Sequence, residues 1–362
     1  MLYLFSFVLI LSLVVIIHEG GHFLVARLCG VQVEAFSVGF GKKIWSRKDK
    51  KGTEWRLCAV PLGGYVQMLG DEDAASTQKS KKKLTPEEEA KTFFAQPVYK
   101  RAAIIFAGPF MNYVLAIFIF ACILATIGNP RIPAKVGQVL PDSVAERAGI
   151  QVGDLILSVN GNAVSDFTDL IRAVQLGNYG QAIELQIDRN GEILNLSATP
   201  ELVGKDQIPQ LGIASDGSVA VSFEQYNPIV AVGKAVEMVY QMNVDTFLYL
   251  KQIIMGQRKA NDLRGPVGIA EASGDAARQG GWLGLILFLA QVSVGIGFVN
   301  LLPVPILDGG HLAFLAYEAV IRRPVSERIQ NALLKAGMGL LLFLFCFTLF
   351  KDIPRVIERI FG

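Results

Sequence analysis

The sequence predicts a polytopic α-helical membrane protein with about four transmembrane helices, a β-hairpin region and one inserted α+β domain. Of the 362 residues, 52% are hydrophobic and 18% are charged, and the mean hydropathy is +0.41. That composition is too apolar for an ordinary soluble enzyme and is typical of a membrane protein. The net charge of +2 gives no global field that would favour nucleic acid as a partner. The four cysteines lack paired spacing, which predicts neither a disulfide framework nor a thiolate metal site.

Four apolar runs are the candidate transmembrane helices. They cover residues 2–17 (resuming over 23–26), 102–127, 282 to about 302, and 336–350. A bilayer requires roughly 20 helical residues, so the fourth run must borrow from the residues that precede it. The first run could instead be a secretory signal peptide, but no basic residue precedes it and no small-residue cleavage site follows.

The basic residues of the loops predict an orientation. Residues 27–101 hold 15 Lys and Arg against 9 Asp and Glu, and the connection at 318–335 adds four more basic residues. Both segments fall on one side of a four-span arrangement, which the positive-inside rule makes cytoplasmic. The predicted segments are a first transmembrane helix at 1–28, a β-hairpin region at 29–70, a charged linker at 71–100, a second transmembrane helix at 101–128, an inserted outer domain at 129–222, an amphipathic helix and connector at 223–281, a third transmembrane segment at 282–321, and a fourth with a tail at 322–362.

The first apolar run contains two histidines and a glutamate, His18, Glu19 and His22. Residues four apart project from one face of a helix, so both imidazoles can reach one ion. This HExxH arrangement predicts two zinc ligands with a carboxylate that handles a proton. Two core histidines with a glutamate at the membrane interface are the plainer alternative. Ionisable residues inside a bilayer are costly, however, and a divalent ion would offset that cost.

A second polar cluster, NLLPVPILDGGH, occupies residues 300–311. Asp308 follows eight residues of which only Asn300 is polar, and we expect it at the same membrane depth as His18. Prolines and glycines break the helix here, and broken helices at membrane depth are tolerated where they line a watery cavity. The sequence therefore predicts a pocket where two spans meet, with Asp308 as the candidate third ligand. A kinked helix with a capping aspartate is the alternative.

Residues 129–222 are more polar and alternate like strands. Ser143 is a candidate N-cap, residues 167–176 have helical periodicity, and Asn190-Gly191 favours a type I′ hairpin turn. This pattern resembles a PDZ domain. Its groove could receive a peptide or a new C-terminus, or the domain could only exclude bulky substrates.

Taken together, the motifs resemble the site-2 protease family of intramembrane zinc metalloproteases, especially the bacterial branch typified by the regulator of sigma-E protease. HExxH stands at 18–22 and NxxPxPxLDGG at 300–310, while FAGPFMN (106–112) and LRGPVGIA (263–270) resemble further family stretches. The resemblance covers nearly the whole chain, but only one PDZ domain fits, where that branch carries two. It implies that His18, His22 and Asp308 ligate Zn2+, that Glu19 is the general base, and that Asn300 lies by the substrate.

The resemblance also implies a function and a location. We expect a multi-pass zinc endopeptidase of the bacterial cytoplasmic (inner) membrane, with its PDZ domain outside. It would cleave within or near the transmembrane segments of single-span membrane proteins in regulated intramembrane proteolysis, for example anti-sigma factors or remnant signal peptides. The alternative is a PDZ-containing membrane scaffold or quality-control receptor without proteolytic activity. The intact Glu19 argues against a scaffold, which needs no base between two ligands.

Three structural alternatives stay open. The family has a membrane-associated β-hairpin where residues 37–45 and 54–69 predict short strands with glycine turns, and its edge could accept a substrate strand or be inert. The helix predicted at 228–256 could lie on the membrane or pack on the PDZ domain. His311 could support the metal ligands or simply lie at the membrane interface.

Overall fold

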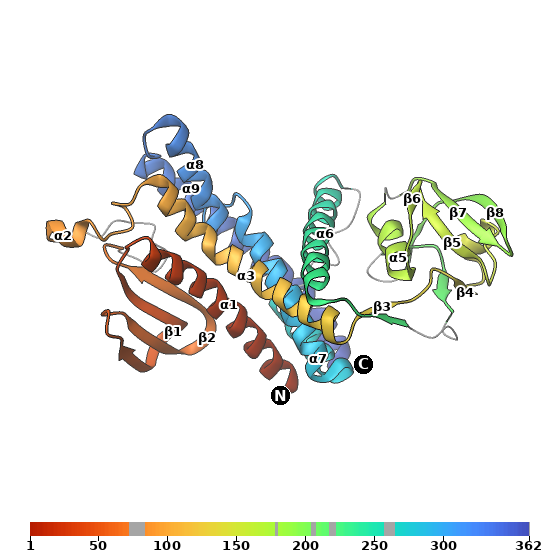
Figure 1. Cartoon of the computed structure of the whole chain (residues 1–362), viewed down its shortest axis with the longest axis horizontal. Helices are drawn as coiled ribbons and strands as arrows, with labels where there is room; N and C mark the ends of the chain where they lie inside the picture. The colour runs from red at the N-terminus through yellow and green to blue at the C-terminus, as the bar shows by residue number, and fades with distance from the viewer. Residues whose placement is uncertain (72–83, 178–179, 204–207, 217–221, 257–264, 362) are drawn as a thin grey trace. The chain divides into compact units, whose positions relative to one another are not determined.

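The computed structural model describes residues 1–71, 84–177, 180–203, 208–216, 222–256 and 265–361, and is shown in Figure 1. The chain forms two compact units. The first comprises Met1–Phe120 with Arg264–Gly362, and the second is Ala121–Leu263. Residues 72–83 of the predicted charged linker lie outside the described residues. A later part of that linker forms the short helix α2 (Pro86–Glu89). Thr85 and Glu88 cap the N-terminus of this helix with a capping box.

Four helices in the described part of the chain are long and apolar enough to cross a membrane, which confirms the predicted number of spans. They are α1 (Leu2–Leu28), α3 (Val98–Thr126), α7 (Pro266–Leu301) and α9 (Glu327–Phe361). Helices α1 and α9 extend beyond their apolar runs because helical hydrogen bonds continue through polar residues. Helix α7 bends at Gly281, whose φ of +55° and ψ of −140° are not helical and favour glycine.

The first unit is held together by close helix contacts. A Cβ added at Gly21 of α1 would lie 2.3 Å from the carbonyl oxygen of Ala107 in α3, so the two backbones touch there. Ile10 and Val14 of α1 form a buried cluster with Leu285 of α7. Small residues that let helices approach are the usual basis of helix packing in membranes. Helix α1 is thereby fixed against both α3 and α7.

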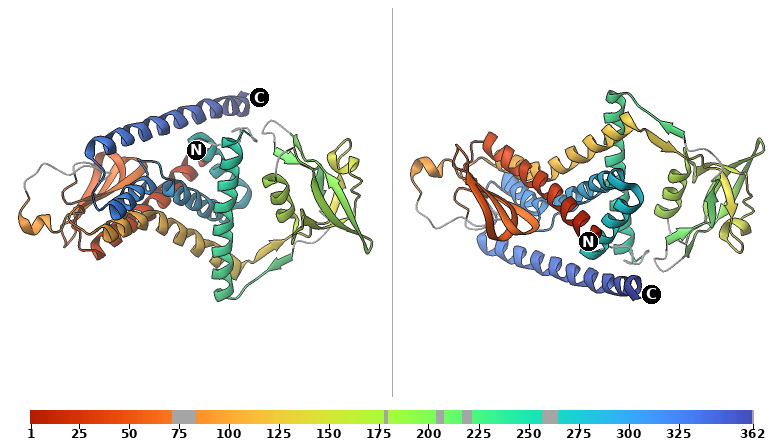
Figure 2. Two further views of the ribbon diagram at one scale, coloured as in Figure 1. Left: turned by 90° about the horizontal axis from the view of Figure 1, so that it is seen from above. Right: turned by 90° about the horizontal axis from the view of Figure 1, so that it is seen from below.

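A long β-hairpin packs beside α1 in the same unit (Figure 1 and Figure 2). Its antiparallel strands are β1 (Val33–Lys48) and β2 (Glu54–Met68). The prediction of short strands with glycine turns is therefore wrong for both strands, since β1 has 16 residues and β2 has 15. Gly39 and Gly41 adopt positive φ angles of +86° and +87° within the strand and accompany shifts in its register. These glycines bend the strand at bulges and do not end it, and sequence spacing cannot separate the two cases.

The second unit contains a domain with its own core. A four-stranded sheet has the order β6-β5-β7-β8, and β11 pairs with β4. Ile156, Leu185 and Ile187 of the sheet are buried against Leu170 and other apolar residues. The elements are β3 (Asn129–Arg131), β4 (Val136–Val139), α4 (Val144–Arg147), β5 (Leu155–Val159), β6 (Asn162–Ala163), α5 (Phe167–Leu176), β7 (Ile183–Arg189), β8 (Glu192–Ala198), β9 (Glu201–Val203), β10 (Ile208–Gln210), β11 (Ile213–Ser215) and β12 (Ser222–Glu224).

Local signals in this domain act as the sequence indicates. The Ser143 hydroxyl accepts a hydrogen bond from the backbone N–H of Glu146 and so caps α4. Asn190 and Gly191 have φ angles of +53° and +90°, as a type I′ turn between β7 and β8 requires. Strand β12 pairs with β3, which brings the two ends of the insertion together.

Helix α6 (Pro228–Ile254) follows this domain in the second unit. The guanidinium of Arg172 in α5 donates two hydrogen bonds of 2.7 Å to the carboxylate of Asp245. The Gln252 amide donates to the carbonyl oxygens of Leu176 and Gly177. The helix therefore contacts the PDZ-like domain, as one of the two alternatives predicts, while large apolar side chains such as Ile229 and Phe247 stay exposed.

Candidate metal centre

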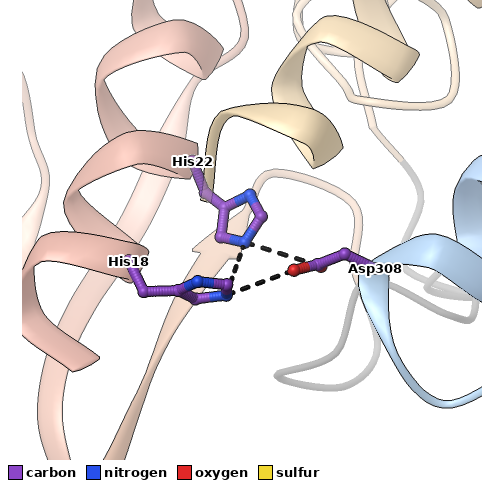
Figure 3. A group of neighbouring side chains, drawn as sticks. All are labelled: His18, His22 and Asp308. Carbon is purple, nitrogen blue, oxygen red and sulfur yellow. Dashed lines mark hydrogen bonds and ion pairs between the residues drawn. The ribbon is translucent and has the colours of Figure 1, made fainter. Parts of the chain in front are cut away.

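Three predicted ligands meet although they come from opposite ends of the sequence. His18 and His22 lie one turn apart on α1, and Asp308 is the first residue of α8 (Asp308–Ile321). Their side chains point toward one another in Figure 3. The two Nε2 atoms are 3.3 Å apart, and Nε2 of His18 is 3.2 Å from Oδ2 of Asp308. Nε2 of His22 is 3.6 Å from Oδ1 of Asp308.

These separations fit a zinc ion. Ligand atoms at 2.0–2.2 Å from a tetrahedral zinc lie about 3.3–3.6 Å from one another, close to the separations of 3.2, 3.3 and 3.6 Å found here. Oδ2 of Asp308 is buried, and apart from its 3.2 Å contact with Nε2 of His18 no described residue hydrogen-bonds to it. A buried carboxylate oxygen without such a partner is costly unless a cation is near. Two imidazoles and one carboxylate also form the donor set of catalytic zinc sites that keep a fourth position open.

The tautomer of His22 is fixed by the helix beside it. Its Nδ1 lies 2.8 Å from the carbonyl oxygen of Ile104 in α3. A carbonyl can only accept, so Nδ1 carries a proton, and in the neutral ring Nε2 is left with the lone pair that a metal would bind. A backbone carbonyl in this role is a common partner of a metal-ligating histidine.

Glycine at 108 makes room for both imidazoles. A Cβ there would lie 2.3 Å from Nε2 of His22 and 2.9 Å from Cε1 of His18. Glycine is therefore required for α3 to pass this close to the ligands of α1. Neither Gly108 nor Asn112, whose amide lies 3.2 Å from Nδ1 of His18, is among the site residues that the sequence predicts. Their spacing of four places them on one face of α3, which is the signal that could have identified them.

The break between α7 and α8 places the aspartate. Helix α7 ends at Leu301, and the chain turns back so tightly that a Cβ on Gly309 would lie 2.3 Å from the carbonyl oxygen of Leu301. A Cβ on Gly310 would lie 2.2 Å from the carbonyl oxygen of Val304. Asp308 thus begins α8, where the helix dipole favours a negative charge. The predicted helix break is present, and the two glycines after Asp308 allow it.

One cavity of about 330 Å³ contains all the predicted site residues. Glu19 and Asn300 line it together with the three candidate ligands, and so does His311. Strand β2 contributes Gly63, Gly64 and Val66 to the same wall. The structure therefore brings a carboxylate, a metal-binding cluster and a strand edge to one space within the first unit.

Comparison with known proteins identifies the family of the chain. The model of peptidase family M50 matches residues 6–344. A protein of Mesorhizobium japonicum named as a zinc metalloprotease is 40% identical, over 97% of this chain and 98% of its own. Metalloprotease MmpA of Caulobacter vibrioides is 36% identical, over 97% of this chain and 95% of its own.

Solved structures match a smaller part of the chain. The PDZ domain of an SdrC-like protein from Listeria monocytogenes is 21% identical and covers 22% of this chain and 84% of its own, with a TM-score of 0.21. Its counterpart from Listeria innocua is 18% identical and covers 24% and 97%, with a TM-score of 0.22. The family model and the near-full-length relatives show that the chain belongs to peptidase family M50 and is a metalloprotease.

Proposed function

We propose that this metalloprotease is an intramembrane zinc endopeptidase that cleaves within or near the transmembrane segments of single-span membrane proteins. The observation that carries the proposal is the convergence of His18, His22 and Asp308 at zinc-ligand spacing, on helices that include candidate membrane spans. Zinc is the cofactor, since relatives over nearly the whole chain are named zinc metalloproteases.

The residues divide the chemistry among them. His18 and His22 would hold the ion through Nε2, and Asp308 would hold it through a carboxylate oxygen. When bound, zinc supplies a Lewis acid for a water molecule and for the peptide carbonyl. The Glu19 carboxylate would accept a proton from a water molecule as its oxygen bonds to the peptide carbonyl carbon, and would return that proton to the amine nitrogen as the C–N bond breaks. Asn300 lies across the same cavity, where its amide can hydrogen-bond to the substrate backbone.

The position of β2 in the cavity wall suggests how a transmembrane substrate segment binds at the site. A transmembrane helix bonds its own carbonyls internally, so cleavage requires local unwinding. Strand β2 lines the cavity at Gly64 and Val66, next to Glu19. An extended substrate segment added along this strand would replace its lost helical hydrogen bonds with sheet hydrogen bonds. This supports a substrate that binds as an added strand. If the edge of β2 is inert instead, substitutions in β2 should not change the rate of cleavage.

The PDZ-like domain supplies a second, separate cavity of about 250 Å³. Helix α5 lines one side with Leu170 and Val174, and Leu211, Gly212 and Ile213 line the other. A groove between a helix and a strand suits an extended peptide or a C-terminus. We propose that it receives such a segment, and that the domain lies outside the bacterial inner membrane because the basic loops belong on the cytoplasmic side.

One assay tests the proposal directly. The full-length chain in detergent is incubated with a single-span peptide, with and without a zinc chelator, and the products are located by mass spectrometry. We expect a cut within or near the apolar segment that stops on chelation and returns with added zinc. Cleavage that persists without metal, or that occurs only in the polar tails, would contradict the proposal. A scaffold predicts no cleavage at all and no effect of Glu19→Gln on function in cells.

A further inference from the structure

Asn112 lies directly behind one of the candidate zinc ligands. Its side chain is fully buried in α3, and its Nδ2 is 3.2 Å from Nδ1 of His18. Its Oδ1 is also buried, and no described residue hydrogen-bonds to it. The backbone carbonyl of Asn112 accepts a 2.9 Å hydrogen bond from the hydroxyl of Ser293 in α7. Asn112 thus contacts α1 through its amide and α7 through its backbone carbonyl.

The protonation of Nδ1 of His18 determines whether the oxygen or the nitrogen of the Asn112 amide can face this atom. Nε2 of His18 points to His22 and Asp308, so only Nε2 can bind the ion. A neutral imidazole that gives its Nε2 lone pair to a metal carries its proton on Nδ1. That Nδ1–H needs an acceptor, and an amide NH2 group cannot accept. Rotation of the amide by 180° exchanges nitrogen and oxygen with almost no change in shape, and it gives the buried Oδ1 a partner.

We propose that Asn112 is a positioning residue of the metal centre whose Oδ1 accepts a hydrogen bond from Nδ1–H of His18. The Ile104 carbonyl plays the corresponding role for His22, so α3 orients both imidazoles. This inference rests on the proposed zinc site. A partner of this kind fixes the ring and the tautomer, and its loss typically weakens metal binding by about 10–100-fold.

Two substitutions distinguish the loss of the hydrogen-bond acceptor from a change in packing. Asn112→Leu keeps the branching at Cγ and removes the acceptor, while Asn112→Asp keeps an acceptor and removes the NH2 group. Ser293→Ala is the matched control, because it removes the hydrogen bond to the Asn112 backbone and leaves the amide in place. The zinc Kd of each full-length protein is measured in detergent by competition with a chromophoric chelator.

We expect Asn112→Leu to raise the zinc Kd about 10–100-fold, and both Asn112→Asp and Ser293→Ala to stay within about threefold of the unaltered chain. An unchanged Kd in Asn112→Leu would overturn the proposal. So would an Asn112→Asp or Ser293→Ala variant as weak as Asn112→Leu, because shape or packing would then set the affinity. If the unaltered chain itself binds no zinc, the proposed function fails. If that chain binds zinc and Asn112→Leu binds equally well, only this inference fails.

A second measurement needs no variant at position 112. The chain contains three histidines, so 15N-histidine labelling gives few signals. In the zinc-loaded chain we expect Nδ1 of His18 to carry a proton and to show the corresponding nitrogen shift. An unprotonated Nδ1 would overturn the proposal even if Asn112→Leu did not fold.

Discussion

The contact between Gly108 and the two histidines allows a sharp test of how the metal centre is built. In Gly108→Ala the new Cβ would lie 2.3 Å from Nε2 of His22 and 2.6 Å from its Cε1, and ordinary contacts begin at 3.4 Å. The imidazole must therefore move by about 1 Å, whereas metal–ligand distances tolerate only about 0.2 Å. Because a 1 Å misplacement can cost about 100-fold in rate, we expect at least that loss of turnover together with weaker zinc binding.

The substitution does not lower the helix propensity of α3. Alanine favours a helix over glycine by about 1 kcal/mol, so the unfolding temperature of Gly108→Ala should not fall as its zinc affinity does. Gly20→Ala is the matched control, since a Cβ at Gly20 of α1 would meet nothing within 4 Å. Zinc content, turnover of a single-span peptide and thermal unfolding are measured for both variants. Zinc binding and turnover in Gly108→Ala within threefold of the unaltered chain would refute the reasoning.

Three further predictions concern charged groups. Glu19→Gln should keep bound zinc and lose about 10²–10⁴-fold in turnover, as metal analysis and peptide cleavage can show. Asp308→Asn should lose zinc on purification, and unchanged zinc content would indicate a different third ligand. In the PDZ-like domain burial opposes ionisation of Asp154, but the Arg189 guanidinium and the Gln151 N–H hold its pKa below the ordinary value. The stability that this ionised carboxylate gives is present above about pH 4 and is lost as pH falls through the lowered pKa. In Asp154→Asn, the free energy of opening measured by hydrogen exchange in this domain should therefore fall less on acidification.

Much of the architecture follows from local signals. Four apolar runs predict four spans because a bilayer sets both the length and the composition of a crossing helix. The turn at Asn190-Gly191 and the cap at Ser143 depend on residues a few positions apart, so they too can be identified from sequence. The length of β1 cannot be identified in this way, because glycines such as Gly39 and Gly41 occur both in turns that end a strand and in bulges within one.

The chain's composition and the HExxH spacing by themselves determined a membrane protein with a candidate metal site, since one helix turn places His18 and His22 on one face. Only the tertiary structure decided what surrounds that face. The approach of α3 at Gly108 and the acceptors offered by Ile104 and Asn112 depend on contacts between helices distant in sequence. No local pattern specifies such contacts, because they arise only when separately formed helices pack to atomic fit.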